Sequence, residues 1–367
     1  MHRFARFMGA VSLAAVIAVI GVACGGGSSS SNGFRGVALT GAGATFPDPI
    51  YEKWFKTFVT VESGAKINYQ AVGSGGGVTQ YTAGTVDFGA SDAPLKDAEI
   101  QAIKAAGRDV IEVPTVLGGV VIAYNASGLQ SGLKLDGTTA ANIFLGKIKA
   151  WNDPAIAALN SGVTLPATPI QVVHRSDESG TTKVFTSWLS KESSEWQTKV
   201  GADKAVQWPV GTGGDGNDGV AAGISQTDGA IGYLSFDFAV NSGLGVASIK
   251  RDSDGQFVAP SVASISAAGG ILKFPITSDT NILNSSAAGA YPISTTTYLL
   301  INPSPTNQDK GQTLVDFLYW ALHQGQQQVT SLNYSPLPQD IQTQAVALLG
   351  GIKFNGQTIQ PSPAVKG

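Results

Sequence analysis

The segment IQVVHRSDESGTTKVFTSWL (Ile170–Leu189) decides the fold class. Its first five residues, Ile170–His174, are mostly apolar and fit a short buried strand. The residues that follow the turn predict a helix with one apolar face, formed by Val184, Phe185, Trp188 and Leu189. A strand that leads through a polar turn directly into a helix is typical of α/β proteins.

The rest of the chain repeats this alternation. INYQAV (Ile67–Val72) alternates like a half-buried strand, and GGVVIAY (Gly118–Tyr124) fits a buried one. Apolar residues at helical spacing predict a helix over Pro47–Phe58. With 367 residues, 43% of them hydrophobic and 13% charged, the chain is long enough for about two domains and for a large core.

Composition excludes several classes of function. The net charge is -3 and there is no basic run, which argues against nucleic acid as a partner. Cys24 is the only cysteine, so an internal disulfide is excluded. The three histidines and the acidic residues show no metal-ligand spacing, so we expect neither a metal nor a cofactor.

The N-terminus has the pattern of an export signal. His2, Arg3 and Arg6 precede an uncharged apolar stretch, and residues 1–23 predict a signal peptide. The alternative is an uncleaved membrane anchor, for which the apolar run is short. Small residues before Cys24 resemble a bacterial lipobox, in which this cysteine is lipidated. The Gly/Ser-rich residues 24–36 then predict a flexible tether to the outer face of a membrane.

Three segments place glycine and a hydroxyl residue just before a predicted helix. They are GAGATFP (Gly41–Pro47), GSGGG (Gly73–Gly77) and SGTT (Ser179–Thr182). The first turn of a helix has unpaired N–H groups and partial positive charge, so it attracts anions. One such loop is also an ordinary helix cap, but three in one chain favour an anion site.

Charged residues accompany these loops. Arg175 follows the strand Ile170–His174, at the end where open α/β sheets bind ligands, and its planar guanidinium suits oxyanions. Asp177 is close enough in sequence to orient it. Asp92 lies in VDFGASDAP (Val86–Pro94), and a carboxylate beside an anion is favourable only where the anion carries a proton. These residues therefore predict a site for hydrogen phosphate that rejects sulfate.

At these residues the chain resembles the phosphate-binding proteins of the phosphate-specific ABC transporter, the PstS family. The stretches that carry the resemblance are TGAGATFP (Thr40–Pro47), GSGGGV (Gly73–Val78), VDFGASDAPL (Val86–Leu95), PTVLGGVV (Pro114–Val121), LGKIKAWND (Leu145–Asp153), HRSDESGTT (His174–Thr182) and GNDGVA (Gly216–Ala221). It extends from about Leu39 to about Leu349. The resemblance implies a substrate-binding protein of an ABC importer that works with a membrane permease and has no enzymatic activity. We expect it to be exported to the periplasm or to the outer face of the cell membrane and to be a monomer, since a receptor must open, dock and release.

The resemblance also implies a set of phosphate ligands. Asp92 would accept the phosphate proton, and Arg175, held by Asp177, would bind directly. The remaining ligands would be hydroxyl and N–H groups of Thr45, Phe46, Ser74, Ser179, Gly180 and Thr181. Two positions depart from the family pattern: Gly75 replaces a frequent second serine, and Glu178 stands where many members have glycine.

The fold implied by the resemblance is a type II periplasmic-binding-protein fold, with two α/β lobes and two crossovers that form a hinge. We expect the crossovers near Pro114–Val121 and near Tyr291–Ile301. Lobe 1 would then combine residues 37–116 with 291–367, and lobe 2 would span 117–290. Phosphate would lie between the lobes and favour their closure.

Other functions fit less well. GTGGDG (Gly211–Gly216) matches a dinucleotide-binding fingerprint, with Asp237 about 20 residues on, but the strand before it is short. His174, Asp177 and Ser179 lie too close in sequence to form a hydrolase triad easily. Two alternatives stay open. The first is a receptor for another oxyanion, such as arsenate, sulfate or molybdate. The second is a surface protein that keeps the phosphate site but serves in sensing or adhesion instead of transport.

Overall fold

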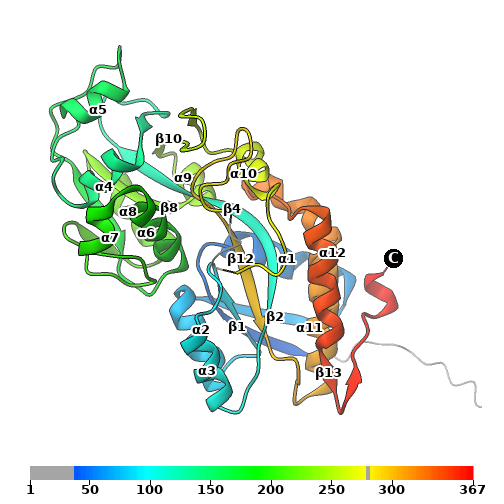
Figure 1. Ribbon diagram of the computed structural model, residues 1–367. Coiled ribbons are helices and arrows are strands. Elements are labelled where there is room, and N and C mark those ends of the chain that lie inside the picture. Colours follow the sequence, from blue (N-terminus) through cyan, green and yellow to red (C-terminus); the bar gives the residue numbers. More distant parts are fainter. Residues whose placement is uncertain (1–36, 278–281, 367) are drawn as a thin grey trace, which may run out of the picture. The chain divides into compact units, whose positions relative to one another are not determined.

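The structure is a computed structural model that describes residues 37–277 and 282–366. The expected signal peptide, Cys24 and the tether lie outside the described residues. Helices and strands alternate along the described chain, which confirms the α/β class (Figure 1). In these ranges no helix has both the length and the apolar character needed to cross a membrane.

One mixed sheet of nine strands organises the described residues. The strand order is β2-β1-β3-β12-β4-β8-β6-β7, and β9 also pairs with β4. The strands are β1 (Ala38–Gly43), β2 (Lys66–Ala71), β3 (Phe88–Ser91), β4 (Ile111–Asn125), β6 (Gln171–Arg175), β7 (Thr212–Gly214), β8 (Ala230–Ser235), β9 (Gly245–Val246) and β12 (Ser294–Ile301). Two small sheets, β11-β10-β5 and β13-β14, contain β5 (Lys134–Leu135), β10 (Ser248–Lys250), β11 (Phe257–Val258), β13 (Lys353–Phe354) and β14 (Gln357–Thr358).

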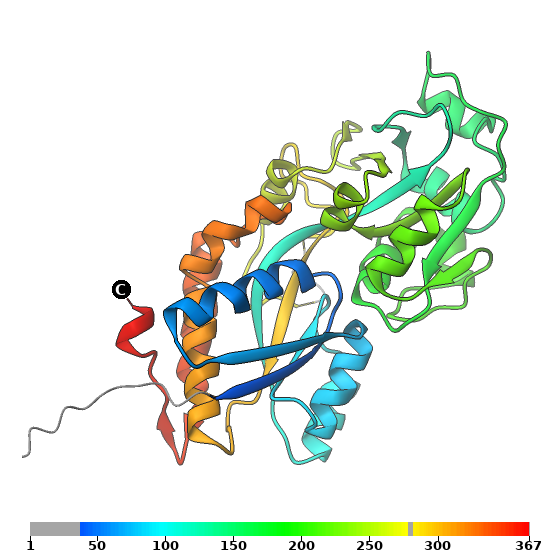
Figure 2. The same cartoon turned by 180° about the vertical axis from the view of Figure 1, so that it is seen from behind.

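The first lobe is built on β2, β1, β3, β12 and the first part of β4. Its helices are α1 (Asp48–Val61), α2 (Gly73–Ala83), α3 (Asp97–Ala105), α11 (Gln308–Ala321), α12 (Gln339–Leu348) and the 3-10 helices η1 (Gln324–Leu332), η2 (Leu349–Gly351) and η3 (Pro363–Val365). Figure 2 shows α1 in front of the strands. It packs on α11 through aromatic rings, with the centroids of Phe55 and Phe317 5.2 Å apart. A second, smaller cluster around Ala42, Val78 and Tyr81 joins α2 to the sheet.

The second lobe is built on β8, β6, β7 and the last part of β4. Its helices are α4 (Gly137–Phe144), α5 (Pro154–Leu159), α6 (Gly180–Glu192), α7 (Ser194–Lys199), α8 (Gly216–Ser225) and α9 (Phe236–Asn241). The ring of Phe185 lies 4.8 Å from that of Phe144 and 4.3 Å from that of Tyr233, which joins α6 to α4 and to β8. Each lobe therefore has an aromatic contact that joins two of its helices.

Strand β4 belongs to both lobes. Residues Ile111–Gly119 pair with β12, and Val120–Asn125 pair with β8. The change of partner falls within Pro114–Val121, where the sequence predicted a crossover. Helix α10 (Val262–Gly269) packs on β4 beside this change, and a hydrogen bond from the Tyr291 hydroxyl to the Val120 carbonyl joins the start of β12 to the same place.

The helices predicted from the sequence form with small shifts. The helix expected over Pro47–Phe58 is α1, which begins at Asp48 and ends at Val61, and the helix after Arg175 is α6. The position of GSGGG was predicted wrongly: the glycines do not precede a helix but are its first turn, because α2 begins at Gly73. A Cβ on Gly77 would lie 2.5 Å from the Gly43 Cα, so close packing of α2 on β1 outweighs the low helix propensity of glycine.

Candidate functional site

The predicted site residues follow the carboxyl ends of three strands. Thr45 follows β1, Asp92 follows β3, and Arg175 is the last residue of β6. The strands β1 and β3 run parallel in the first lobe, while β6 is parallel to its neighbours in the second. Residues from both lobes therefore come together where the carboxyl ends of the strands meet, as open α/β sheets place their ligand sites.

Arg175 is buried and held by a carboxylate. Its Nε donates to Asp177 Oδ1 at 2.6 Å and its Nη2 donates to Asp177 Oδ2 at 2.5 Å, while Nη1 points to the Thr181 hydroxyl at 3.4 Å. The Gly216 N–H donates to Asp177 Oδ1 as well, at 3.2 Å. One edge of the guanidinium, formed by Nε and Nη2, is thus fixed by Asp177, and Nη1 is directed toward the start of α6.

Asp92 is the carboxylate of this site. Its side chain is buried, and the Thr297 hydroxyl donates to Oδ1 at 2.9 Å. Burial raises the pKa of Asp92 to about 7, although Thr297, Arg175, Lys204 and Thr181 oppose the rise. The ionised form is therefore disfavoured unless a proton donor or a cation comes close to it.

Ser74 connects the two lobes. Its Oγ is fully buried and accepts from the N–H of Asp92 at 3.2 Å and from the N–H of Gly180 at 3.1 Å. A Cβ on Gly180 would lie 2.5 Å from this Oγ and 2.7 Å from the Asp92 Cβ. Only glycine allows the start of α6 to approach the first lobe so closely.

Thr45 makes a second contact between the lobes. Its Oγ1 accepts from Asn217 Nδ2 at 2.9 Å and from the Asn217 N–H at 3.3 Å. The carbonyl of Phe46 accepts from the Tyr334 hydroxyl at 2.5 Å, which holds the loop after β1. Sequence reasoning missed Asn217 as a partner, although GNDGVA was among the stretches that carried the family resemblance.

Ser179 has a local structural role. It is the N-cap of α6, and its Oγ accepts from the Thr182 N–H at 3.1 Å. His174 stacks on Trp208, with ring centroids 4.8 Å apart, and Asp177 is committed to Arg175. The three residues that a hydrolase triad would need therefore have separate partners. Gly211–Gly216 contributes an N–H group to the Asp177 carboxylate.

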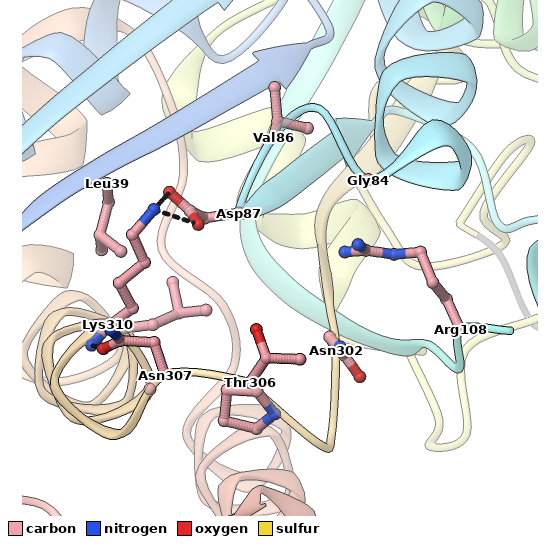
Figure 3. Close-up of a pocket in the computed structure, with 12 residues that line it drawn as sticks. Leu39, Gly84, Val86, Asp87, Arg108, Asn302, Thr306, Asn307 and Lys310 are labelled. Carbon is pink, nitrogen blue, oxygen red and sulfur yellow. Dashed lines mark hydrogen bonds and ion pairs between the residues drawn. The ribbon is translucent and has the colours of Figure 1, made fainter.

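A cavity of about 140 Å³ lies at the other end of the same strands (Figure 3). Leu39 at the start of β1 and Asp87 before β3 line it, whereas Thr45 and Asp92 follow the opposite ends of these strands. Two cations, Arg108 and Lys310, line it, and Lys310 donates to both oxygens of Asp87, at 2.8 and 3.0 Å. This cavity is separate from the residues that the sequence predicted. Within residues 37–277 and 282–366, no group of three or more His, Cys, Asp or Glu side chains could hold a metal ion.

Comparison with known proteins decides the family. A family model described as the PBP superfamily domain matches residues 26–324. The phosphate-binding protein PstS of Pasteurella multocida (strain Pm70) is 43% identical over 306 residues, which cover 83% of this chain and 87% of that protein. The chain belongs to the PstS family. PstS of Methanocaldococcus jannaschii is 34% identical over 360 residues, with 92% of each chain covered.

Solved structures agree on the fold of this PstS-family chain. The phosphate-binding protein from Stenotrophomonas maltophilia aligns with a TM-score of 0.63 at 19% identity, covering 85% of this chain and 93% of that one. The two-lobed periplasmic-binding-protein fold predicted from the sequence is thereby confirmed.

Proposed function

We propose that this chain is the substrate-binding protein of an ABC importer, which binds inorganic phosphate between its lobes and delivers it to a membrane permease. The observation that carries this proposal is that Asp92 of the first lobe lies within the electrostatic reach of Arg175 of the second. Both side chains are buried, and the positive charge of Arg175 stabilises the Asp92 carboxylate. A cation on one lobe and a proton acceptor on the other suit an anion that keeps one proton.

The proposed ligands follow from this arrangement. Arg175 binds phosphate oxygen through the edge that Asp177 leaves free, and Asp92 accepts the phosphate proton. The first turn of α6 and the loop after β1 provide N–H and hydroxyl donors from the two lobes: Thr45, Phe46, Ser74, Ser179, Gly180 and Thr181. The contacts of Ser74 and Thr45 across the lobes support a ligand that is enclosed on both sides.

Asp92 is the proposed source of specificity. Hydrogen phosphate donates its proton to the carboxylate, whereas fully ionised sulfate leaves two negative charges in contact. Burial makes such a contact costly, because an unpaired charge cannot be hydrated there. Arsenate also keeps a proton near neutral pH, so it is expected to compete with phosphate.

The proposed lobes are residues 37–116 with 291–367, and residues 117–290. Opening would separate Ser74 from Gly180 and Thr45 from Asn217, and bound phosphate favours closure because it contacts both sides. We propose binding and transport without enzymatic chemistry and without a cofactor, which accords with the separate partners of His174, Asp177 and Ser179.

Export and lipid anchoring through Cys24 complete the proposal. The signal-like residues 1–23 and the tether support a monomer held at the outer face of a membrane. The test is mass spectrometry of the exported protein, in which a lipidated N-terminal Cys24 is expected. A mature chain that begins elsewhere, or lacks the lipid mass, contradicts the anchor.

The function itself is tested by calorimetric titration of the purified full chain, after bound anion has been removed by dialysis. Phosphate is expected to bind with one-to-one stoichiometry, and sulfate to produce no heat. Equal binding of both anions would contradict the role of Asp92 but keep the receptor function. A folded protein that binds neither anion contradicts the proposed function.

A further inference from the structure

A second cavity, of about 370 Å³, has Asp92 in its wall. Its wall combines the loop after β3, helix α6 and the start of β12. Figure 1 labels α6 and β12. Asp92 and Thr295 line it at the inner end, where the Thr295 hydroxyl donates to the Asp92 carbonyl at 3.2 Å. The cavity therefore adjoins the proposed phosphate site but is built largely from other residues.

Three lysines line this cavity: Lys96 from the first lobe, and Lys183 and Lys191 from α6. Lys96 is neutralised by Asp203, which lies 2.5 Å away on the second lobe. The neighbouring Glu99 is paired in the same way with Lys204, at 2.5 Å. These two ion pairs join the lobes beside the cavity and account for the carboxylates nearest to Lys183.

Lys183 and Lys191 remain as excess positive charge. Neither forms an ion pair with a carboxylate in the part of the chain that the structure describes. The Lys183 ammonium donates to the Ala202 carbonyl at 3.0 Å, and burial, together with Lys96 and Lys204, lowers its pKa. An anion in the cavity would offset the free-energy cost of burying the charged form of Lys183. Lys191 is exposed at the same wall, four residues beyond Ser187.

We propose that this cavity is a capture site for the incoming oxyanion, in which Lys183 and Lys191 attract hydrogen phosphate before it reaches Asp92 and Arg175. The inference rests on the proposed function, because it assigns a second, weaker position to the same ligand. The three lysines outnumber Asp92 in the wall of the cavity. A cleft with an excess of one sign of charge and low-dielectric walls raises the local concentration of the opposite ion and its rate of association.

The side chains explain why this position captures the anion but does not retain it. Lysine is a strongly hydrated point charge on a flexible stem, and it lacks the planar fork by which Arg175 binds two oxygens. The apolar part of the wall, Ala93, Leu95, Val184 and Tyr298, provides no hydrogen-bond donors along most of its surface. The anion would therefore keep much of its water in the cavity and lose it only at the inner site.

The test separates association from retention. Radiolabelled inorganic phosphate is bound to the full chain, the dissociation rate is measured by a chase with unlabelled phosphate, and the dissociation constant by equilibrium dialysis. The variants are Lys191→Gln and the double variant Lys183→Gln with Lys191→Gln. The matched control is Lys149→Gln, which removes an exposed charge from the second lobe away from the cavity.

The association rate is expected to fall about threefold in Lys191→Gln and about tenfold in the double variant, with unchanged dissociation. The difference from the control is expected to vanish near 1 M salt, where charges are screened beyond about 3 Å. An association rate equal to that of the control, or a change in dissociation alone, overturns the capture site while phosphate binding persists. If the folded wild-type chain binds no phosphate, the proposed function fails first.

Discussion

The side chain of Glu178, on the second lobe, fills the space that a side chain at Gly75, on the first lobe, would need. A Cβ on Gly75 would lie 2.1 Å from Glu178 Oε2 and 2.3 Å from the Glu178 Cβ, and the Gly75 N–H donates to the Glu178 carbonyl at 2.9 Å. These are the two positions at which the resemblance implied a departure from the family pattern. We infer that they compensate one another, because the larger residue at 178 leaves space only for the smallest one at 75.

A double-mutant cycle tests this compensation. Gly75→Ser alone is expected to weaken phosphate binding about tenfold, because the added side chain meets Glu178 and holds the lobes apart. In the Glu178→Gly background the same substitution is expected to be nearly neutral, which gives a coupling energy of about 1 kcal/mol or more. Dissociation constants of the four proteins measure it. Additive effects would contradict the compensation.

Arg175 and Asp177 are expected to contribute unequally to phosphate binding. Arg175→Ala leaves buried anion charge without its cation, so we expect at least a thirtyfold loss of affinity, from a cost of about 2–5 kcal/mol. Asp177→Asn keeps the guanidinium but loosens its orientation, and a smaller loss is expected. Arg175→Lys is the matched control for charge without the planar fork. Calorimetry measures all three, and full affinity in Arg175→Lys would contradict the geometric role of the fork.

Asp92→Asn tests how the anion's proton is recognised. Phosphate binding is expected to weaken by about tenfold, less than in Arg175→Ala, since asparagine retains a polar contact. Sulfate binding relative to phosphate is expected to improve, because the repelling carboxylate is gone. Competition titrations with both anions measure this ratio. Continued exclusion of sulfate would show that Asp92 does not select for a protonated anion.

The raised pKa of Asp92 also predicts the pH dependence of stability. A carboxyl whose pKa rises from 3.8 to about 7 on folding stabilises the protein while it is protonated. This contribution is present in full below about pH 4 and is lost as the pH rises to about 7. Asparagine does not titrate, so the midpoint of thermal unfolding of phosphate-free Asp92→Asn, relative to wild type, is expected to increase from pH 5 to 7 and then level off. A constant difference would contradict the prediction.

Local patterns predicted much of the fold, because they act over short stretches of chain. The strand expected over Ile67–Val72 is β2, and Arg175 does end a strand, since periodicity and turn chemistry fix such elements locally. The partners of the site residues were not predictable in this way. Thr297 reaches Asp92 from 205 positions along the chain. Asn217 reaches Thr45 from 172 positions away. The first contact exists only after β12 has paired with β3 inside the first lobe, and the second only after the two lobes have come together.

Gly180 is the position at which closure of the lobes is most sensitive to size. The Cβ of Gly180→Ala would lie within 3 Å of Ser74 and Asp92, both on the opposite lobe. We expect affinity for phosphate to fall about tenfold, for an overpacking cost of about 1–3 kcal/mol, with little change in the phosphate-free melting temperature. Gly350→Ala is the control, because its Cβ meets no atom within 4 Å. Calorimetry and thermal unfolding measure the two effects. A lower phosphate-free melting temperature at full affinity would mean that Gly180 serves the packing of its own lobe rather than the approach of the other.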